Sequence, residues 1–143
     1  MTIATILAGR TDNHVISVAC DTPVRDAVRL LAEHRIGSLP VLKNDKVVGI
    51  MSERDVIYCL ASDGGVMLDW PVERIMTTPA ITVTKDMSAL AALSQMTRKR
   101  IRHLPVLEED RLIAMMSIGD LVAYRINKIE QEAEAMLAYI QNA

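Results

Sequence analysis

Ile36-Gly37-Ser38-Leu39-Pro40-Val41-Leu42 is the stretch that decides the fold, because it returns 65 residues later as Ile101-Arg102-His103-Leu104-Pro105-Val106-Leu107. The same offset relates residues 16–56 to residues 81–121 without an insertion. Each copy continues into a β-rich run and a Ser-x-x-Asp motif, Ser52 to Asp55 in the first and Ser117 to Asp120 in the second. A repeat of this length indicates one supersecondary unit that is present twice, so we expect any function to occur twice as well.

Each copy is predicted to fold as a strand, a helix, two strands and a second helix. In the first copy these elements are expected at residues 15–18, 23–34, 38–42 and 46–51, and from Ser52 to just before Gly64. The second copy repeats them at residues 81–83, 87–99, 103–107 and 111–116, and from Ser117 onward. The evidence is β-branched runs, one-sided apolar helices and polar hairpin turns. The predicted fold class is α/β, of the α+β type, with pseudo-twofold symmetry and a small three-stranded sheet packed on two helices in each repeat.

The chain is expected to divide into two repeats and a helical extension. Residues 1–66 would form the first repeat with a short docking helix at residues 2–7, and residues 67–125 the second, with the boundary in a glycine-containing break. Residues 126–143 would extend the last helix. This extension carries an apolar stripe at helical spacing, made of Ile126, Ile129, Ala133, Met136, Leu137 and Ile140. Because such a stripe usually packs on another helix, we expect a homodimer.

The composition argues against several classes of function. The 143 residues carry a net charge of −2, no Phe and only 3% aromatic residues, which disfavours nucleic-acid binding. No apolar run approaches the roughly 20 residues of a membrane span, and residues 1–10 resemble no export signal, so we expect a cytoplasmic protein with no membrane partner. Cys20 and Cys59 occupy unrelated positions, which favours two reduced thiols over a disulfide or a metal pair. No metal site is expected.

The two Ser-x-x-Asp motifs have two interpretations. Ser-x-x-Asp between a strand and a helix is a capping box, which satisfies free N–H groups in the first helical turn. Its presence at the same point of both repeats, beside the expected sheet edge, also favours a ligand site. A helix N-terminus attracts phosphate, and a carboxylate can accept both hydroxyls of a ribose. The second interpretation predicts a nucleotide.

A group of basic residues precedes the second repeat's hairpin, namely Arg98, Lys99, Arg100, Arg102 and His103. A solvated charged face explains such a group, and so does phosphate binding, because the strands that follow lead to Ser117. Nucleic-acid binding by the same residues is a weaker alternative, given the acidic net charge and the few aromatic residues.

The duplicated unit, the Ile-x-x-Leu-Pro-Val-Leu strand and the paired Ser-x-x-Asp motifs resemble a tandem pair of cystathionine-β-synthase (CBS) domains, the Bateman module, over about residues 2–125. The resemblance implies a stand-alone module that binds adenosine-containing ligands in two clefts between the repeats. AMP, ADP and ATP are the implied ligands, with NADH and S-adenosylmethionine as further candidates. It also implies a regulatory role as an energy sensor for a partner that the sequence does not identify.

The resemblance also implies how the residues divide between the clefts. One cleft would bind ribose through Asp120 and Ser117, with adenine among Met115, Ile16 and Ile36. The other would use Asp55 and Ser52, with adenine among Ile50, Ile81 and Ile101. Arg102, His103, Arg54 and Arg100 would bind phosphate. Gly49 is replaced by Ala114 in the second repeat, and Arg54 by Gly119, so the two clefts are expected to differ in chemistry.

Three function classes follow. A nucleotide-sensing regulator is favoured by the two Ser-x-x-Asp motifs. A dimerisation or interaction scaffold with vestigial clefts is favoured by the apolar stripe of the last helix. An enzyme is disfavoured, because His14, His34 and His103 lack matched partners and the sequence contains no Cys/His dyad, metal-ligand spacing or phosphate-binding glycine loop.

Overall fold

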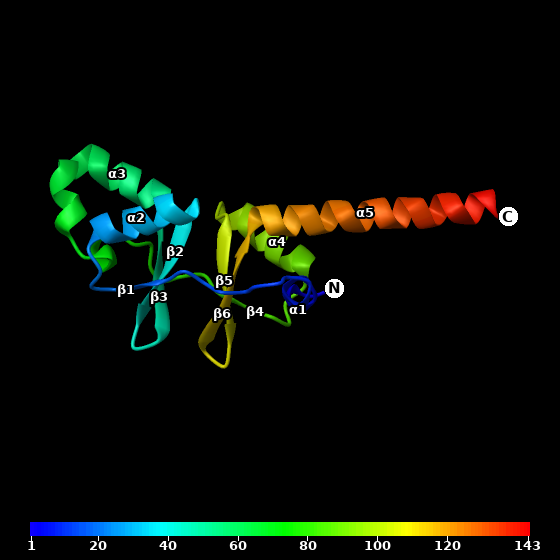
Figure 1. The fold of residues 1–143 in the computed structure, drawn as a ribbon, viewed down its shortest axis with the longest axis horizontal. Coiled ribbons are helices and arrows are strands. Elements are labelled where there is room, and N and C mark those ends of the chain that lie inside the picture. Colours follow the sequence, from blue (N-terminus) through cyan, green and yellow to red (C-terminus); the bar gives the residue numbers. More distant parts are fainter.

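A computed structural model describes residues 1–143 as two similar halves that lie side by side, with one long helix projecting from the second (Figure 1). The first half contains β1 (Val18–Ala19), α2 (Val24–His34), β2 (Ser38–Lys43), β3 (Lys46–Ser52), α3 (Glu53–Asp63), and the 3₁₀ turns η1 (Gly64–Asp69) and η2 (Val72–Arg74). The second half contains β4 (Val83–Thr84), α4 (Ala89–Lys99), β5 (His103–Glu108), β6 (Arg111–Ser117) and α5 (Ile118–Gln141), and α1 (Ile3–Ala8) precedes both.

Each half contains one three-stranded sheet with the same topology. The strand orders are β1-β2-β3 and β4-β5-β6, and in each sheet the first pair is parallel and the second antiparallel. The hairpins turn through Asn44-Asp45 and Glu109-Asp110, whose positive φ angles match the tight turn that short hairpins favour. The predicted fold class, α/β of the α+β type with two three-stranded sheets, is confirmed.

The core of each half lies between its sheet and its helices. In the first half, Leu39, Val41 and Met51 are fully buried on one face of the sheet and pack with Val24 and Ala27 of α2. The equivalent core of the second half contains the strand residues Leu104, Val106 and Met116, all fully buried. In β3 and β6 the buried residues alternate with half-buried ones, whereas four consecutive residues of β2 and three of β5 are buried.

The two cores exchange segments across the chain. The docking helix α1 does form, but its fully buried Ile3 packs in the core of the second half, and the backbone N–H of Ile3 donates to Met87 O at 2.9 Å. Conversely, the fully buried Met67 and Val72 of the turns η1 and η2 complete the core of the first half. The expected division at residues 66 and 67 remains a division of the sequence, because the packing crosses it in both directions.

Several predicted boundaries shift. The first strand of each half is shorter and later than predicted, Val18–Ala19 and Val83–Thr84, so Ile16 and Ile81 precede the sheet. The segment predicted as a glycine-containing linker contains η1, because Met67 anchors it to a core. The long last helix is confirmed as one element, α5, and from residue 122 onward its side chains are exposed or half-buried. No helix combines the length and the apolar character needed to cross a membrane.

Candidate functional site

Both Ser-x-x-Asp motifs are capping boxes. The hydroxyl of Ser52 accepts from the backbone N–H of Asp55 at 3.2 Å, and the carboxylate of Asp55 accepts from the backbone N–H of Ser52 at 2.9 Å. The Ser117 and Asp120 pair repeats these contacts at 3.1 and 2.9 Å. The capping interpretation is therefore confirmed for both motifs. It leaves the second interpretation open, because a carboxylate has lone pairs beyond those that a cap uses.

A cavity of about 240 Å³ lies beside Asp55, between the two halves. The first half contributes Gly37, Ser38, Ile50, Ser52, Glu53, Arg54 and Asp55, the connecting segment contributes Thr77, Pro79, Ala80 and Ile81, and the second half contributes Arg100, Ile101, Arg102 and His103. The five residues predicted for this cleft and the four predicted to bind phosphate thus line one cavity. The residues that the sequence did not single out are mainly those of segment 77–80 and Glu53.

The apolar side of the cavity depends on how segment 77–81 crosses β3. Thr77 and Ile50 exchange two backbone hydrogen bonds, of 2.8 and 3.0 Å, and the hydroxyl of Thr77 donates to Oδ1 of Asp55 at 3.0 Å. Gly49 permits this approach, because a Cβ atom there would lie 2.5 Å from Met76 Sδ and 2.8 Å from Thr77 O. Ile50, Ile81 and Ile101 all line the cavity and form its aliphatic slot.

The polar side of the cavity carries an excess of positive charge. None of the guanidinium groups of Arg54, Arg100 and Arg102 forms an ion pair within the molecule. Arg100 ends α4 in the left-handed conformation, so the chain turns directly into the cavity wall. Unpaired guanidinium groups around a partly enclosed space are suited to an anion such as a phosphate.

His103 is the cavity residue with a perturbed pKa. Burial lowers the pKa of the His103 imidazole, the positive charge of Arg102 lowers it further, and the carboxylates of Asp120 and Glu53 oppose the shift. His103 is therefore held toward its neutral form, in which it can both donate and accept a hydrogen bond. Nearby, the hydroxyl of Ser38 is buried without a hydrogen-bond partner, which leaves it available to a bound molecule.

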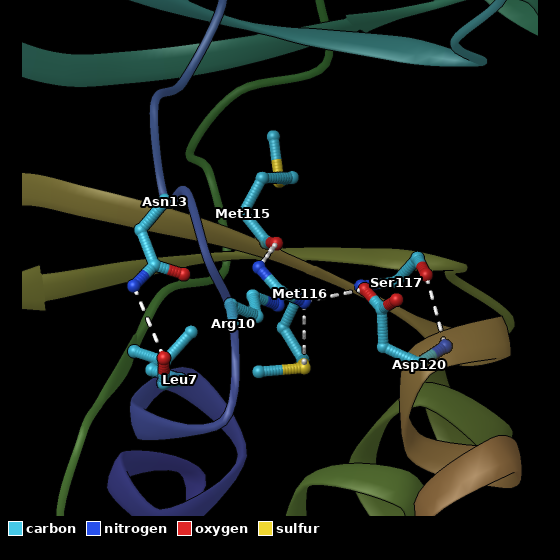
Figure 2. A network of polar contacts seen from close by, with 7 residues as sticks. All are labelled: Leu7, Arg10, Asn13, Met115, Met116, Ser117 and Asp120. Carbon is cyan, nitrogen blue, oxygen red and sulfur yellow. Dashed lines mark hydrogen bonds and ion pairs between the residues drawn. The ribbon is translucent and has the colours of Figure 1, made fainter.

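The equivalent carboxylate of the second half is engaged by a residue from the N-terminus. Arg10 Nη2 lies 2.7 Å from Asp120 Oδ2, and Arg10 Nη1 donates to the backbone carbonyl of Met115 at 3.1 Å (Figure 2). Of the residues predicted for this cleft, Ile16 and Ile36 pack against the first core, and Met115 lies half-buried on β6. Sequence reasoning missed Arg10. In the 65-residue repeat, Arg10 corresponds to Ile75, two residues before Thr77.

No group of three or more His, Cys, Asp or Glu side chains lies close enough together to hold a metal ion. Cys20 and Cys59 are both free thiols. The residues around the two Ser-x-x-Asp motifs offer hydrogen bonds, an ion pair and aliphatic contacts.

Known proteins with the same repeat were found by sequence and by structure. A family model described as CBS domain matches residues 10–62 and 72–127. The mitochondrial CBS domain-containing protein CBSX3 of Arabidopsis thaliana is 36% identical over 126 residues, which cover 85% of this chain and 61% of that relative. The structure of a putative signal-transduction protein with CBS domains from Burkholderia ambifaria aligns with a TM-score of 0.83 at 36% identity, over 89% of this chain and 95% of the other. The CBS domain pair of protein MJ0100, solved with 5-methylthioadenosine and S-adenosyl-L-methionine, aligns with a TM-score of 0.77 at 22% identity, over 90% and 98% of the two chains.

Proposed function

The chain belongs to the CBS-domain family and carries two copies of the domain, and we propose that it is a regulatory module that binds an adenosine-containing nucleotide beside Asp55. In this proposal the carboxylate of Asp55 accepts the ribose hydroxyls. The adenine lies in the aliphatic slot of Ile50, Ile81 and Ile101.

The observation that carries the proposal is the cavity itself. It combines a carboxylate, an apolar slot and three unpaired guanidinium groups, and these match the three parts of a nucleotide in kind. Arg54, Arg100, Arg102 and His103 are proposed to contact the phosphates. The buried hydroxyl of Ser38, which has no partner within the molecule, is a further polar group for the ligand.

AMP, ADP and ATP are the proposed ligands, with NADH and S-adenosylmethionine as further candidates. The complex of the MJ0100 domain pair with two adenosine derivatives supports this ligand class. The number of guanidinium groups favours a ligand with one or more phosphates over an uncharged nucleoside, because each unpaired guanidinium can form a charge-assisted hydrogen bond with a phosphate oxygen.

A regulatory rather than catalytic role is proposed because the cavity is shared between the halves. A bound nucleotide would contact Asp55 of the first half and Arg102 of the second, so its affinity would depend on how the halves are arranged. A ligand that binds one arrangement more tightly shifts the population toward that arrangement. A partner protein would then respond to the change.

Thermal unfolding of the purified protein with AMP, ADP, ATP, NADH or S-adenosylmethionine, each at millimolar concentration, tests the proposal. A ligand at about 100 times its Kd adds roughly 2.7 kcal/mol to the free energy of unfolding. For a chain of this size we expect Tm to rise by roughly 5 to 10 °C. Guanosine and inorganic phosphate at the same concentrations are the controls, and we expect neither to reproduce the shift.

The second candidate function is a dimerisation scaffold, and the surface of α5 favours it. Its side chains Ile126, Ile129, Met136, Leu137 and Ile140 are between 49% and 62% exposed, and an apolar stripe of this kind usually covers another helix. We propose that two chains pair through this stripe, whichever function holds. If no adenine ligand raises Tm while sedimentation shows a stable dimer, the scaffold replaces the nucleotide sensor as the proposed function.

A further inference from the structure

The segments that precede the first strand of each half approach the two Asp carboxylates in equivalent ways. Residues 75–77 cross β3, where Thr77 bonds to the backbone of Ile50 and to the side chain of Asp55. The equivalent segment, residues 10–12, approaches β6, where Arg10 bonds to the backbone carbonyl of Met115 and to the side chain of Asp120. In each half the two acceptors are thus a strand carbonyl and an Asp carboxylate. The peptide and neutral hydroxyl of Thr77 contact them in the first half, and the cationic side chain of Arg10 contacts them in the second.

The contact of Arg10 with Asp120 is well anchored. The side chain of Arg10 is only 23% exposed, and a second contact of its Nη2 reaches Met116 Sδ at 3.7 Å (Figure 2). The segment is held further by Asn13, whose side-chain amide donates to the backbone carbonyl of Leu7 at 3.2 Å. Since α1 is itself packed in the second core, Arg10 is presented to Asp120 from a fixed point of the fold.

The two clefts also differ in their other cations. The 65-residue offset relates Arg54 of the Asp55 cavity to Gly119, which carries no charge, and it relates Arg102 and His103 to Gly37 and Ser38, two uncharged residues that line the Asp55 cavity themselves. Arg35 replaces Arg100 and is the one basic residue kept at these four positions. Arg10 is the cation that the structure places directly on Asp120. The Asp55 cavity therefore carries its positive charge on several side chains. At Asp120 the positive charge lies on one residue, Arg10, which is already paired with the carboxylate.

We propose that Arg10 determines ligand specificity in the Asp120 cleft by acting as an exchangeable internal ligand of Asp120. The ribose hydroxyls of an entering nucleotide must displace the guanidinium of Arg10 from Asp120 and bind the carboxylate in its place. The released guanidinium then pairs with the phosphate. An uncharged nucleoside releases the guanidinium without offering it a new partner. The inference rests on the proposed function, since it assumes that adenine nucleotides are the ligands of this protein.

The size of the discrimination follows from the bonds of Arg10. A hydrogen bond between charged groups in a partly buried site corresponds to a factor of about 10 to 100 in affinity. A nucleotide regains this factor, because its phosphate pairs with the displaced guanidinium of Arg10, whereas a nucleoside loses it. The cleft should therefore prefer AMP to adenosine by about 10- to 100-fold, and the preference should depend on Arg10.

Calorimetric titration of AMP and adenosine into an Asp55→Asn background isolates the Asp120 cleft. In that background, Arg10→Met keeps the length of the side chain and removes its charge. We expect Arg10→Met to tighten adenosine binding by about 10-fold and to reduce the preference for AMP to about 3-fold or less. Arg10→Lys, which keeps the charge, should retain most of the preference for AMP. Arg29→Ala, which removes an exposed arginine that lies 3.5 Å from Asp26 on α2, is the matched control and should change neither affinity.

The outcomes separate the inference from the proposed function. Adenosine binding that gains about 10-fold in Arg10→Met, or that becomes measurable in Arg10→Met where the parent background shows none, supports the inference. Affinities for AMP and adenosine that both stay within twofold in a folded Arg10→Met protein overturn it. Wild-type protein that binds AMP beside Asp55, together with an Arg10→Met background that binds neither ligand, overturns the inference alone. Absence of binding in every variant, wild type included, overturns the proposed function as well.

Discussion

Asp55 and Asp120 occupy equivalent positions in equivalent capping boxes, yet one faces a cavity and the other is paired with an arginine. The difference does not come from the motif or from the sheet, because both are repeated nearly unchanged. It comes from the segments that approach β3 and β6. These segments supply Thr77 to Asp55 and Arg10 to Asp120. Duplication preserved the carboxylate, and the segments that arrive from elsewhere in the chain place different side chains against it.

The exchange of segments between the cores explains how this difference is maintained. Each half is completed by a piece that precedes it or follows it in the sequence, α1 for the second core and η1 with η2 for the first. These pieces also fix the position of residues 10–13 and 75–81. The chemistry of each cleft is therefore built into the packing of both halves rather than into one repeat.

Replacing each carboxylate in turn with an amide should give the largest difference in AMP binding between the two clefts. Asp55→Asn should weaken AMP binding about 10- to 100-fold, because a charged acceptor of the ribose hydroxyls is lost. Asp120→Asn should leave the tighter dissociation constant within about threefold of the wild type. The amide oxygen can still accept from the N–H of the capping serine, so both proteins are expected to fold, and titration calorimetry measures both constants. Equal losses from the two variants would contradict the inequality of the clefts.

Gly49→Ala and Ala114→Gly form a matched pair for the close approach of segment 76–77. An added Cβ at Gly49 would meet Met76 Sδ and the backbone of Thr77, so we expect a loss of about 1 to 3 kcal/mol in the free energy of unfolding and weaker AMP binding.

The reverse change, Ala114→Gly, removes a buried methyl group from the second core and should cost about 1 kcal/mol without affecting AMP binding beside Asp55. Chemical denaturation gives both free energies. A Gly49→Ala protein that kept wild-type stability and affinity would show that the segment moves freely.

The smallest expected effect concerns pH. Because the pKa of His103 is lowered in the folded state, the unfolded state binds more protons below about pH 6.5. The free energy of unfolding should therefore fall as the pH is lowered from 7 to 5, by at most about 1.4 kcal/mol per pH unit from this group. Asp120, Glu53 and Arg102 are the charges that face His103.

His103→Gln should flatten this dependence, and His34→Gln, which alters an exposed histidine at the end of α2, should leave it unchanged. Denaturation curves at several pH values check both variants. Identical slopes for the two variants would show that His103 does not remain neutral in the fold.

The order of elements could be predicted because it depends on local patterns. Short β-branched runs and one-sided apolar helices indicated the strand and helix types. The first strands were predicted too long, because β-branched residues such as Ile16 and Ile81 also suit an extended segment outside the sheet. Nine of the 15 residues that line the Asp55 cavity could be predicted from a resemblance that already contained the tertiary arrangement. Thr77 could not, because its role depends on a crossing that no local pattern marks.

What the sequence by itself determined is the duplication, the topology within each repeat and the two capping boxes, since these rest on contacts between residues close along the chain. Only the tertiary structure decided that α1 completes the second core, that residues 77–81 line a cavity and that Arg10 pairs with Asp120, 110 residues away. Contacts of such separation depend on how α1, η1 and η2 pack in the two cores. A single polar residue like Arg10 carries no periodic signal that would reveal its partner.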